Sequence, residues 1–177
     1  MGATNVFRTT GRTAGVITLI ADIAKGIFAV SLVNFIPVNI SVLSADSYAA
    51  SLGLFAVLGH CYSPFMKFKG GKGVATGLGM FLILMPKITL LAILIFAITV
   101  YISRYVSLAS IIAASSVPIL YYTISNGHNG FILFCSVAAV GFITARHIEN
   151  IERLIAGKEN KLDKPKNSKP IRATNPN

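Results

Sequence analysis

A glycine-rich basic loop is the part of this sequence best suited to chemistry. Residues 67–77 read KFKGGKGVATG and lead directly into an apolar run. Glycines let backbone N–H groups approach a ligand closely, and successive N–H groups can form an anion-binding concavity. A helix beginning after Gly73 would add unpaired N–H groups and a favourable dipole. The loop predicts a phosphate cradle, although basic loops also mark membrane topology. It is not a nucleotide P-loop, because Gly73 follows Lys72 where Ser or Thr is required.

Three further polar segments carry candidate binding groups. Residues 2–8, GATNVFR, end in Arg8, whose guanidinium suits phosphate but equally suits a simple membrane flank. Residues 103–110, SRYVSLAS, offer serines that could cap the next helix or bind a phosphate or carbonyl. In the amphipathic segment 146–161, His147 and Asn150 share one helical face. His147 could act as a base or phosphate donor, though a single surface histidine usually does neither.

Composition predicts that lipid is the main solvent of this chain. Hydrophobic residues make up 54% and charged residues 12% of the 177 residues, with a mean hydropathy of +0.69. Soluble domains carry roughly 25% charged residues, so a soluble fold would lack charge to cover its surface. The net charge of +10 fits topology signals and attraction to anionic lipids or substrates. Nucleic acid is not an expected partner, because no binding motif or basic–aromatic tail is present.

Cysteine and histidine spacing gives no reason to expect a metal or other cofactor. Cys61 and Cys135 lie far apart and form no CxxC motif, so we expect both to be small apolar packing residues. His60 adjoins Cys61, but no third or fourth ligand follows at metal-site spacing.

Apolar runs separated by short polar breaks predict an all-α, polytopic transmembrane helix bundle of about six spans. Several runs are shorter than the ~20 residues of an upright span, which suggests a polar site inside the bundle. The domain is expected to cover residues 1–162, followed by a disordered basic cytoplasmic tail, 163–177. The predicted apolar runs are 14–36, 47–62, 74–85, 88–102, 106–124 and 131–146.

The positive-inside rule brings the polar segments together. With the N-terminal arm in the cytoplasm, six crossings place all four candidate segments on the cytoplasmic face. Together they offer Arg, Lys, Ser, His, Asn and glycine N–H groups, which is an anion-binding set. Asp22 and Lys25 lie three residues apart in the first run and are expected to pair inside the membrane.

These segments resemble, in order and spacing, the motifs of the acyl-phosphate-dependent glycerol-3-phosphate acyltransferases, the PlsY family. The resemblance rests on GATNVFR, GHCYSPFMKFKGGKGVATGLG, SRYVSLAS and RHIENIERLIAGKENKL. Family members usually begin with a further apolar helix and a Ser-Gly-Asn-Ile segment before GATN. This chain starts at GATN and so apparently lacks the first transmembrane helix of a full-length, seven-span member.

The resemblance implies an enzyme of the bacterial inner membrane with its active site facing the cytoplasm. It would transfer an acyl chain from acyl phosphate to the 1-hydroxyl of sn-glycerol 3-phosphate, giving lysophosphatidic acid and inorganic phosphate. This is the first step of phospholipid synthesis and needs neither acyl-CoA nor acyl carrier protein. The catalytic residues implied are His147, Lys72, Arg8 and Asn150. The substrate-binding residues implied are Asn5, Lys69, Gly70, Gly71, Gly73, Thr76, Ser107 and Ser110.

A small membrane transporter or scaffold without catalytic activity is the alternative. A transporter would be expected to show internal repeats and an ionisable group at mid-membrane. Asp22 and Lys25 are the only such pair, and no repeat is evident. Acyl-chain preference and oligomeric state do not follow from the sequence.

Overall fold

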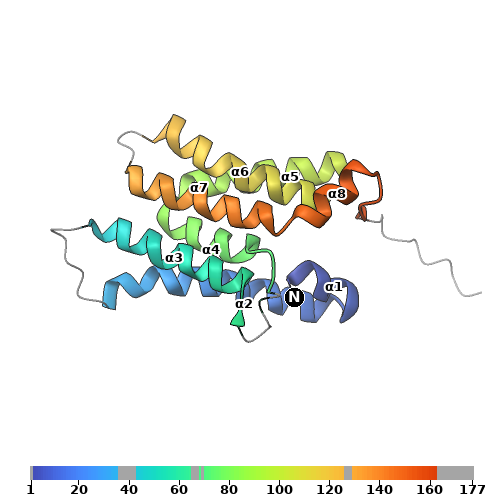
Figure 1. Ribbon diagram of the computed structural model, residues 1–177, viewed down its shortest axis with the longest axis horizontal. Coiled ribbons are helices and arrows are strands. Elements are labelled where there is room, and N and C mark those ends of the chain that lie inside the picture. Colours follow the sequence, from blue (N-terminus) through green and yellow to red (C-terminus); the bar gives the residue numbers. More distant parts are fainter. Residues whose placement is uncertain (1, 36–42, 65–67, 69, 126–128, 163–177) are drawn as a thin grey trace, which may run out of the picture.

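The protein is a bundle of helices (Figure 1). The structure, a computed structural model, describes residues 2–35, 43–64, 68, 70–125 and 129–162, without the side chain of Arg8. Within these ranges all regular elements are helical. The predicted tail, 163–177, lies outside the described residues. The elements are α1 (Ala3–Thr9), α2 (Arg12–Ser31), η1 (Leu32–Phe35), α3 (Ala45–Cys61), α4 (Val74–Leu84), α5 (Pro86–Ser103), α6 (Val106–Ile124), α7 (Gly130–Ala145) and α8 (Ile148–Ile155).

Helices α2 to α7 correspond to the six predicted apolar runs and traverse the bundle in alternating directions (Figure 1). Among the described residues, three helical segments are long and apolar enough to cross a membrane alone: Arg12–Phe35, Pro86–Ser103 and Val106–Ile124. Helices α7 and α8, bent by 58° at their junction, qualify as a fourth when taken together. Helix α4 has only 11 residues, as its short apolar run predicted.

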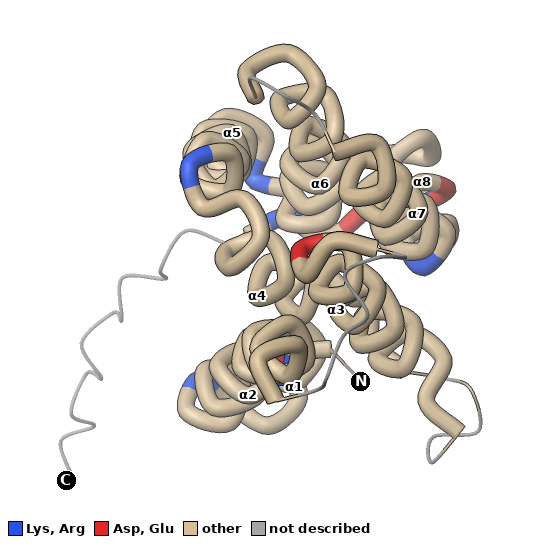
Figure 2. The backbone as a smooth tube through the Cα atoms, turned by 90° about the vertical axis from the view of Figure 1, so that its left-hand side faces the viewer, with Lys and Arg blue, Asp and Glu red and all other residues tan. Residues whose placement is uncertain are grey.

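Close backbone packing places the short helix α4 in the middle of the bundle. A Cβ on Gly26 of α2 would lie 2.1 Å from the Thr76 carbonyl oxygen of α4. A Cβ on Gly79 would likewise lie 2.1 Å from the Ile23 carbonyl oxygen. Small residues let helices approach this closely in membranes. Figure 2, which looks along the helices, shows α4 between α2 and the α5–α6 side of the bundle.

Residue distribution agrees with a membrane environment. Small and medium apolar side chains fill the centre, among them Val57, Met80 and Ile143. Large apolar side chains instead face outward on the long helices, including Ile20, Phe28, Leu90, Ile98, Ile119 and Phe134. Exposed apolar surface of this extent marks contact with lipid or partners. Cys61 and Cys135 are buried and unbridged, which confirms their predicted role as packing residues.

The start of α6 differs from the prediction. The segment 103–110 was expected to place a serine at the N-cap of this helix, but Tyr105 occupies the N-cap and makes no side-chain cap. The Ser103 hydroxyl donates instead to the Thr99 carbonyl, 2.6 Å away, and accepts from the Tyr105 N–H. Ser103 therefore ends α5, where Arg104 turns the chain with a φ of 64°.

Candidate active site

The four candidate segments meet at one end of the bundle around a cavity of about 1120 Å³. Its polar end is lined by Asn5, Lys72, Ser107, Ser110, His147, Asn150 and Glu159. Its deeper part is lined by apolar side chains of α4, α5 and α6, namely Leu78, Phe81, Ala92, Ile93, Phe96, Ala113, Ala114 and Val117. The cavity thus joins a polar, partly cationic compartment to an apolar one.

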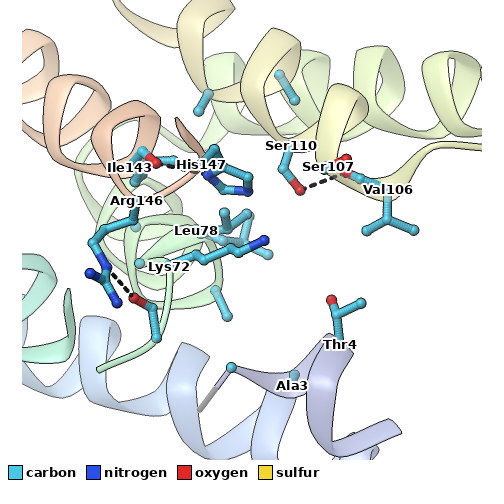
Figure 3. Close-up of a pocket in the computed structure, with 18 of the residues that line it drawn as sticks. Ala3, Thr4, Lys72, Leu78, Val106, Ser107, Ser110, Ile143, Arg146 and His147 are labelled. Atoms are coloured by element: carbon cyan, nitrogen blue, oxygen red, sulfur yellow. Dashed lines mark hydrogen bonds between the residues drawn. The ribbon is translucent and has the colours of Figure 1, made fainter. Parts of the chain in front are cut away.

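Lys72 is the charge at the centre of the polar end. Its side chain leaves the glycine-rich loop and extends toward the space between His147, Ser107 and Thr4 (Figure 3). The Lys72 ammonium donates a hydrogen bond to the side-chain oxygen of Asn150, on α8. This contact joins segments 78 positions apart in sequence. The expectation that the loop and the His147 segment share one face of the protein is therefore confirmed.

Glu159 organises the polar wall beside Lys72. One carboxylate oxygen accepts from the Asn150 amide at 2.8 Å and from the Ser107 hydroxyl at 3.0 Å. The other accepts from Arg153 Nε at 2.8 Å. Burial alone would raise the pKa of Glu159, but the hydrogen bonds from Asn150, Arg153 and Ser107 hold that pKa below its usual value. Glu159 is therefore ionised and fixes the orientation of the Asn150 side chain toward Lys72.

His147 lies just beyond the end of α7, with only 2% of its surface exposed. Its Nδ1 lies 2.7 Å from the Ile143 carbonyl oxygen, which can only accept, so Nδ1 carries the proton. Nε2 then presents a lone pair, and the ring turns toward Ser110 (Figure 3). Burial lowers the pKa of His147 to about 4, so the ring is neutral near pH 7.

The glycines of the loop have a packing role that the sequence did not reveal. A Cβ on Gly70 would lie 2.0 Å from the His60 carbonyl oxygen, and one on Gly71 2.0 Å from His60 Nε2. The Gly71 N–H donates to the His60 carbonyl at 3.0 Å, so this N–H group is already used. Arg146 Nε and Nη2 donate to the carbonyls of Gly71 and Gly70, at 3.2 and 3.1 Å. The loop is thus held between α3 and the end of α7.

Gly73 combines packing with a special backbone geometry. Its φ is 79°, in the left-handed region that favours glycine, and it is the N-cap residue of α4. A Cβ there would lie 2.9 Å from Cys61 Sγ. The helix start predicted directly after Gly73 is confirmed.

The structure brings most of the predicted site residues to the cavity. Asn5, Gly70, Gly71, Lys72, Gly73, Ser107, Ser110, His147 and Asn150 line it. Lys69 lies outside the described residues, and so does the side chain of Arg8, whose backbone belongs to α1. Thr76 is not among the residues that line the cavity. Its side chain is fully buried, although Ala75 and Gly77 on either side of it line the cavity.

Sequence reasoning missed four residues at this site: Glu159, Arg146, His60 and Asp22. All four line the cavity. Glu159 lies nine residues after Asn150, beyond the reach of helical spacing arguments, so the sequence did not connect the two. Arg146 was assigned only to topology, and Asp22 only to its pair with Lys25. That pair is confirmed, at 3.1 Å. Among the described residues, no three His, Cys, Asp or Glu side chains are grouped as metal ligands.

Comparison with known proteins connects this geometry to one family. The sequence model described as glycerol-3-phosphate acyltransferase matches residues 1–157. A glycerol-3-phosphate acyltransferase of Endomicrobium trichonymphae is 47% identical over 161 residues, covering 91% of this chain and 77% of the relative. The corresponding protein of Geotalea daltonii is 43% identical over 160 residues, covering 90% and 78%.

Two solved structures similar to this chain are of a protein with the same described activity as these relatives. The crystal structure of PlsY, an integral membrane glycerol 3-phosphate acyltransferase, in its glycerol 3-phosphate form matches with a TM-score of 0.81 at 36% identity. The match covers 92% of this chain and 78% of PlsY. The lysophosphatidic acid form matches with a TM-score of 0.78, also at 36% identity, over 92% and 79% of the two chains. An acyltransferase is thus favoured over a transporter or scaffold. The chain belongs to the glycerol-3-phosphate acyltransferase family and is an integral membrane protein of all-α fold.

Proposed function

We propose that this protein transfers an acyl chain from acyl phosphate to the 1-hydroxyl of sn-glycerol 3-phosphate. The products are lysophosphatidic acid and inorganic phosphate. The observation that carries the proposal is the convergence of Lys72, Asn150 and His147 at the polar mouth of a largely apolar cavity. An acyl donor with a charged phosphate head and a long apolar tail suits such a cavity. The relatives are glycerol-3-phosphate acyltransferases, so we take glycerol 3-phosphate as the acceptor.

The polar end supplies groups for binding phosphate. Lys72 provides full positive charge, and Asn150 and Ser107, held by Glu159, provide directed polar groups beside it. Ser110 and Asn5 face the same space. We assign phosphate or headgroup contacts to these residues, to Arg8 and Lys69, and to the backbone of Gly70, Gly71 and Gly73. The apolar lining of α4, α5 and α6 holds the acyl chain.

The reaction needs little activation of the nucleophile, because phosphate is a good leaving group. The 1-hydroxyl oxygen attacks the carbonyl carbon of the acyl phosphate and forms the new ester bond. The bond between that carbon and the bridging phosphate oxygen breaks, and phosphate leaves with the electron pair. Lys72 stabilises the negative charge that develops on the departing phosphate, which we expect to be the largest catalytic contribution.

The hydroxyl proton has two possible acceptors. One is His147 Nε2, whose lone pair is set by the bond from Nδ1 to the Ile143 carbonyl. The other is an oxygen of a substrate phosphate. His147 and Asn150 position glycerol 3-phosphate in either case. We place this end of the bundle in the cytoplasm of a bacterial cell, at the inner membrane, because its basic loops follow the positive-inside rule.

The test is release of inorganic phosphate from palmitoyl phosphate by the purified protein, with and without glycerol 3-phosphate. We expect release that depends on the acceptor, with lysophosphatidic acid formed in equal amount. Palmitoyl-CoA as sole donor is the comparison and should give no product. Phosphate release independent of glycerol 3-phosphate, or transfer from palmitoyl-CoA alone, would contradict the proposal. A parallel form carrying the additional N-terminal helix expected from the family controls for any contribution of that segment.

A further inference from the structure

A buried carboxylate in α2 is connected to the glycine-rich loop through a histidine of α3. Asp22 lies within the apolar helix α2, and only 4% of its surface is exposed. Two cationic or potentially cationic groups face it: Lys25 Nζ at 3.1 Å and His60 Nδ1 at 3.5 Å, both measured to Oδ1. The Lys25 side chain is 63% exposed, whereas that of His60 is 9% exposed. His60, on α3, is therefore the buried partner of Asp22. Ionisable groups inside membrane helices are costly and usually functional.

The opposite nitrogen of the His60 ring touches the loop. A Cβ on Gly71 would lie 2.0 Å from His60 Nε2, so this ring nitrogen lies close against the Gly71 backbone. The His60 carbonyl also accepts the Gly71 N–H at 3.0 Å. Asp22 on one ring nitrogen and Gly71 at the other thus fix the position of the imidazole. His60 connects helix α2 to the residue that immediately precedes Lys72.

The other side of the loop is held by Arg146. Its guanidinium donates to the carbonyls of Gly70 and Gly71, and it lies 5.5 Å from the ring centre of Tyr62. The two glycines are therefore held between an arginine at the end of α7 and a histidine at the end of α3. The position of the Lys72 backbone follows from these two contacts.

We propose that Asp22 is a positioning residue for the phosphate site. Its carboxylate orients His60, His60 supports Gly71, and this support sets the place from which Lys72 reaches the substrate phosphate. Asp22 also lines the cavity, but in this proposal it acts through His60. The inference rests on the proposed function of Lys72 and adds the buried pair in α2 and α3 to the site.

The first test replaces Asp22 by Asn, which keeps the shape of the side chain and removes its charge. We expect the KM for palmitoyl phosphate to rise about tenfold or more, with kcat also reduced, because Lys72, which we assign to the phosphate of this donor, is displaced. A role in folding alone would lower the amount of active protein, and so kcat, at an unchanged KM. Asp46→Asn is the matched control, since Asp46 is exposed in the first turn of α3 at the far end of the bundle. It should stay within about twofold of the unchanged protein.

The second test uses the contact between His60 and Gly71. Gly71→Ala should impair the unchanged protein strongly, because the new methyl group would collide with His60 Nε2. In a His60→Ala background the ring is absent, so adding Gly71→Ala should cost at least fivefold less in kcat/KM. Non-additivity of this kind reports direct contact.

These experiments distinguish a failure of the proposed function from a failure of the positioning role of Asp22. If the unchanged protein transfers no acyl chain, the proposed function is wrong. If it is active but Asp22→Asn leaves KM unchanged, or Gly71→Ala costs the same with and without His60, the positioning role of Asp22 through His60 is wrong. All variants are assayed after size-exclusion chromatography, so that only monodisperse protein is compared.

Discussion

The two ends of the bundle use polar residues in opposite ways. At the far end, the Asn129 side-chain oxygen caps α7 by accepting from the backbone N–H groups of Phe131 and Ile132, at 3.0 and 3.3 Å. The Asn129 amide nitrogen donates to Ser47 and Ser44 of the α3 start, at 3.1 and 3.3 Å. The Tyr121 hydroxyl accepts the Asn129 N–H. These groups are neutral, and they satisfy one another.

At the site end the polar groups are charged and surround a cavity instead. Lys72, Asn150, Glu159 and Arg153 form a connected chain of hydrogen bonds along its wall. Charged groups cost more to bury than neutral ones, so their concentration at one end indicates a role beyond stability. Polar residues at the two ends of membrane helices therefore need not be equivalent. Those at the far end link helices to one another, and those at the site end line the cavity that we propose binds substrate.

The largest effect that separates the two ends is expected from their lysines. Lys72→Ala should lower kcat/KM at least a hundredfold, because the developing phosphate charge loses its nearest cation. Lys87→Ala, at the exposed start of α5, should change it by no more than about twofold. Steady-state rates with palmitoyl phosphate and glycerol 3-phosphate measure both. Near-normal turnover of the Lys72 variant would refute the assignment of the site end.

At the site end, the stability of the folded protein is expected to depend on pH through His147. The pKa of His147 is lowered from 6.5 to about 4, so the unfolded chain binds this proton more tightly than the folded protein does. Stability from this group is complete above pH 6.5 and falls as the pH drops toward 4. Between pH 6.5 and about pH 5 the loss should be about 2 kcal/mol.

The midpoint of thermal unfolding, measured in detergent across this range, tests the pH prediction. His147→Gln should show a flatter pH dependence than the unchanged protein, because its side chain does not titrate. Glu159, whose pKa is lowered from 4.5, loses its contribution only at lower pH, so the two groups are separated. An equally steep decline in the His147 variant would show that another group is responsible.

The smallest effect is expected at the far end. Asn129→Ala removes the N-cap of α7 and its bridge to α3, and should cost about 1–2 kcal/mol of stability. Turnover per folded molecule should remain within about twofold of normal. Thermal unfolding and steady-state rates, measured on the same preparation, check both parts. A large loss of turnover at full stability would contradict the separation of the two ends.

Much of the architecture could be predicted because a membrane helix is visible in the sequence as a continuous run of apolar residues. The six apolar runs became α2 to α7, and the short run at 74–85 became the short helix α4. The convergence of Lys72 with His147 and Asn150 followed from counting crossings, since an even number of spans returns the chain to the same side. No serine caps α6 as expected, because the Ser103 hydroxyl donates instead to the Thr99 carbonyl in α5.

The features of the site that the sequence did not reveal share a physical origin. The resemblance to the family assigned Thr76 to phosphate binding, but its side chain is buried, and the direction in which it points depends on how α4 packs in the bundle. Asp22 was recognised as one half of a pair with Lys25, which is a local contact at three residues' separation. Its contact with His60 depends on the packing of α2 against α3, which no spacing in the sequence reveals.

The sequence by itself determined the membrane class, the helices and the face on which the basic motifs meet. Hydrophobic runs and basic loops act through their own composition, so no knowledge of neighbours is needed to interpret them. Only the tertiary structure decided which side chains meet at the cavity. It showed that Gly70 and Gly71 are glycines because His60 leaves no room for a Cβ, and that Glu159 holds Asn150 beside Lys72. Such contacts depend on the rotation and separation of packed helices, which are properties of the assembled bundle.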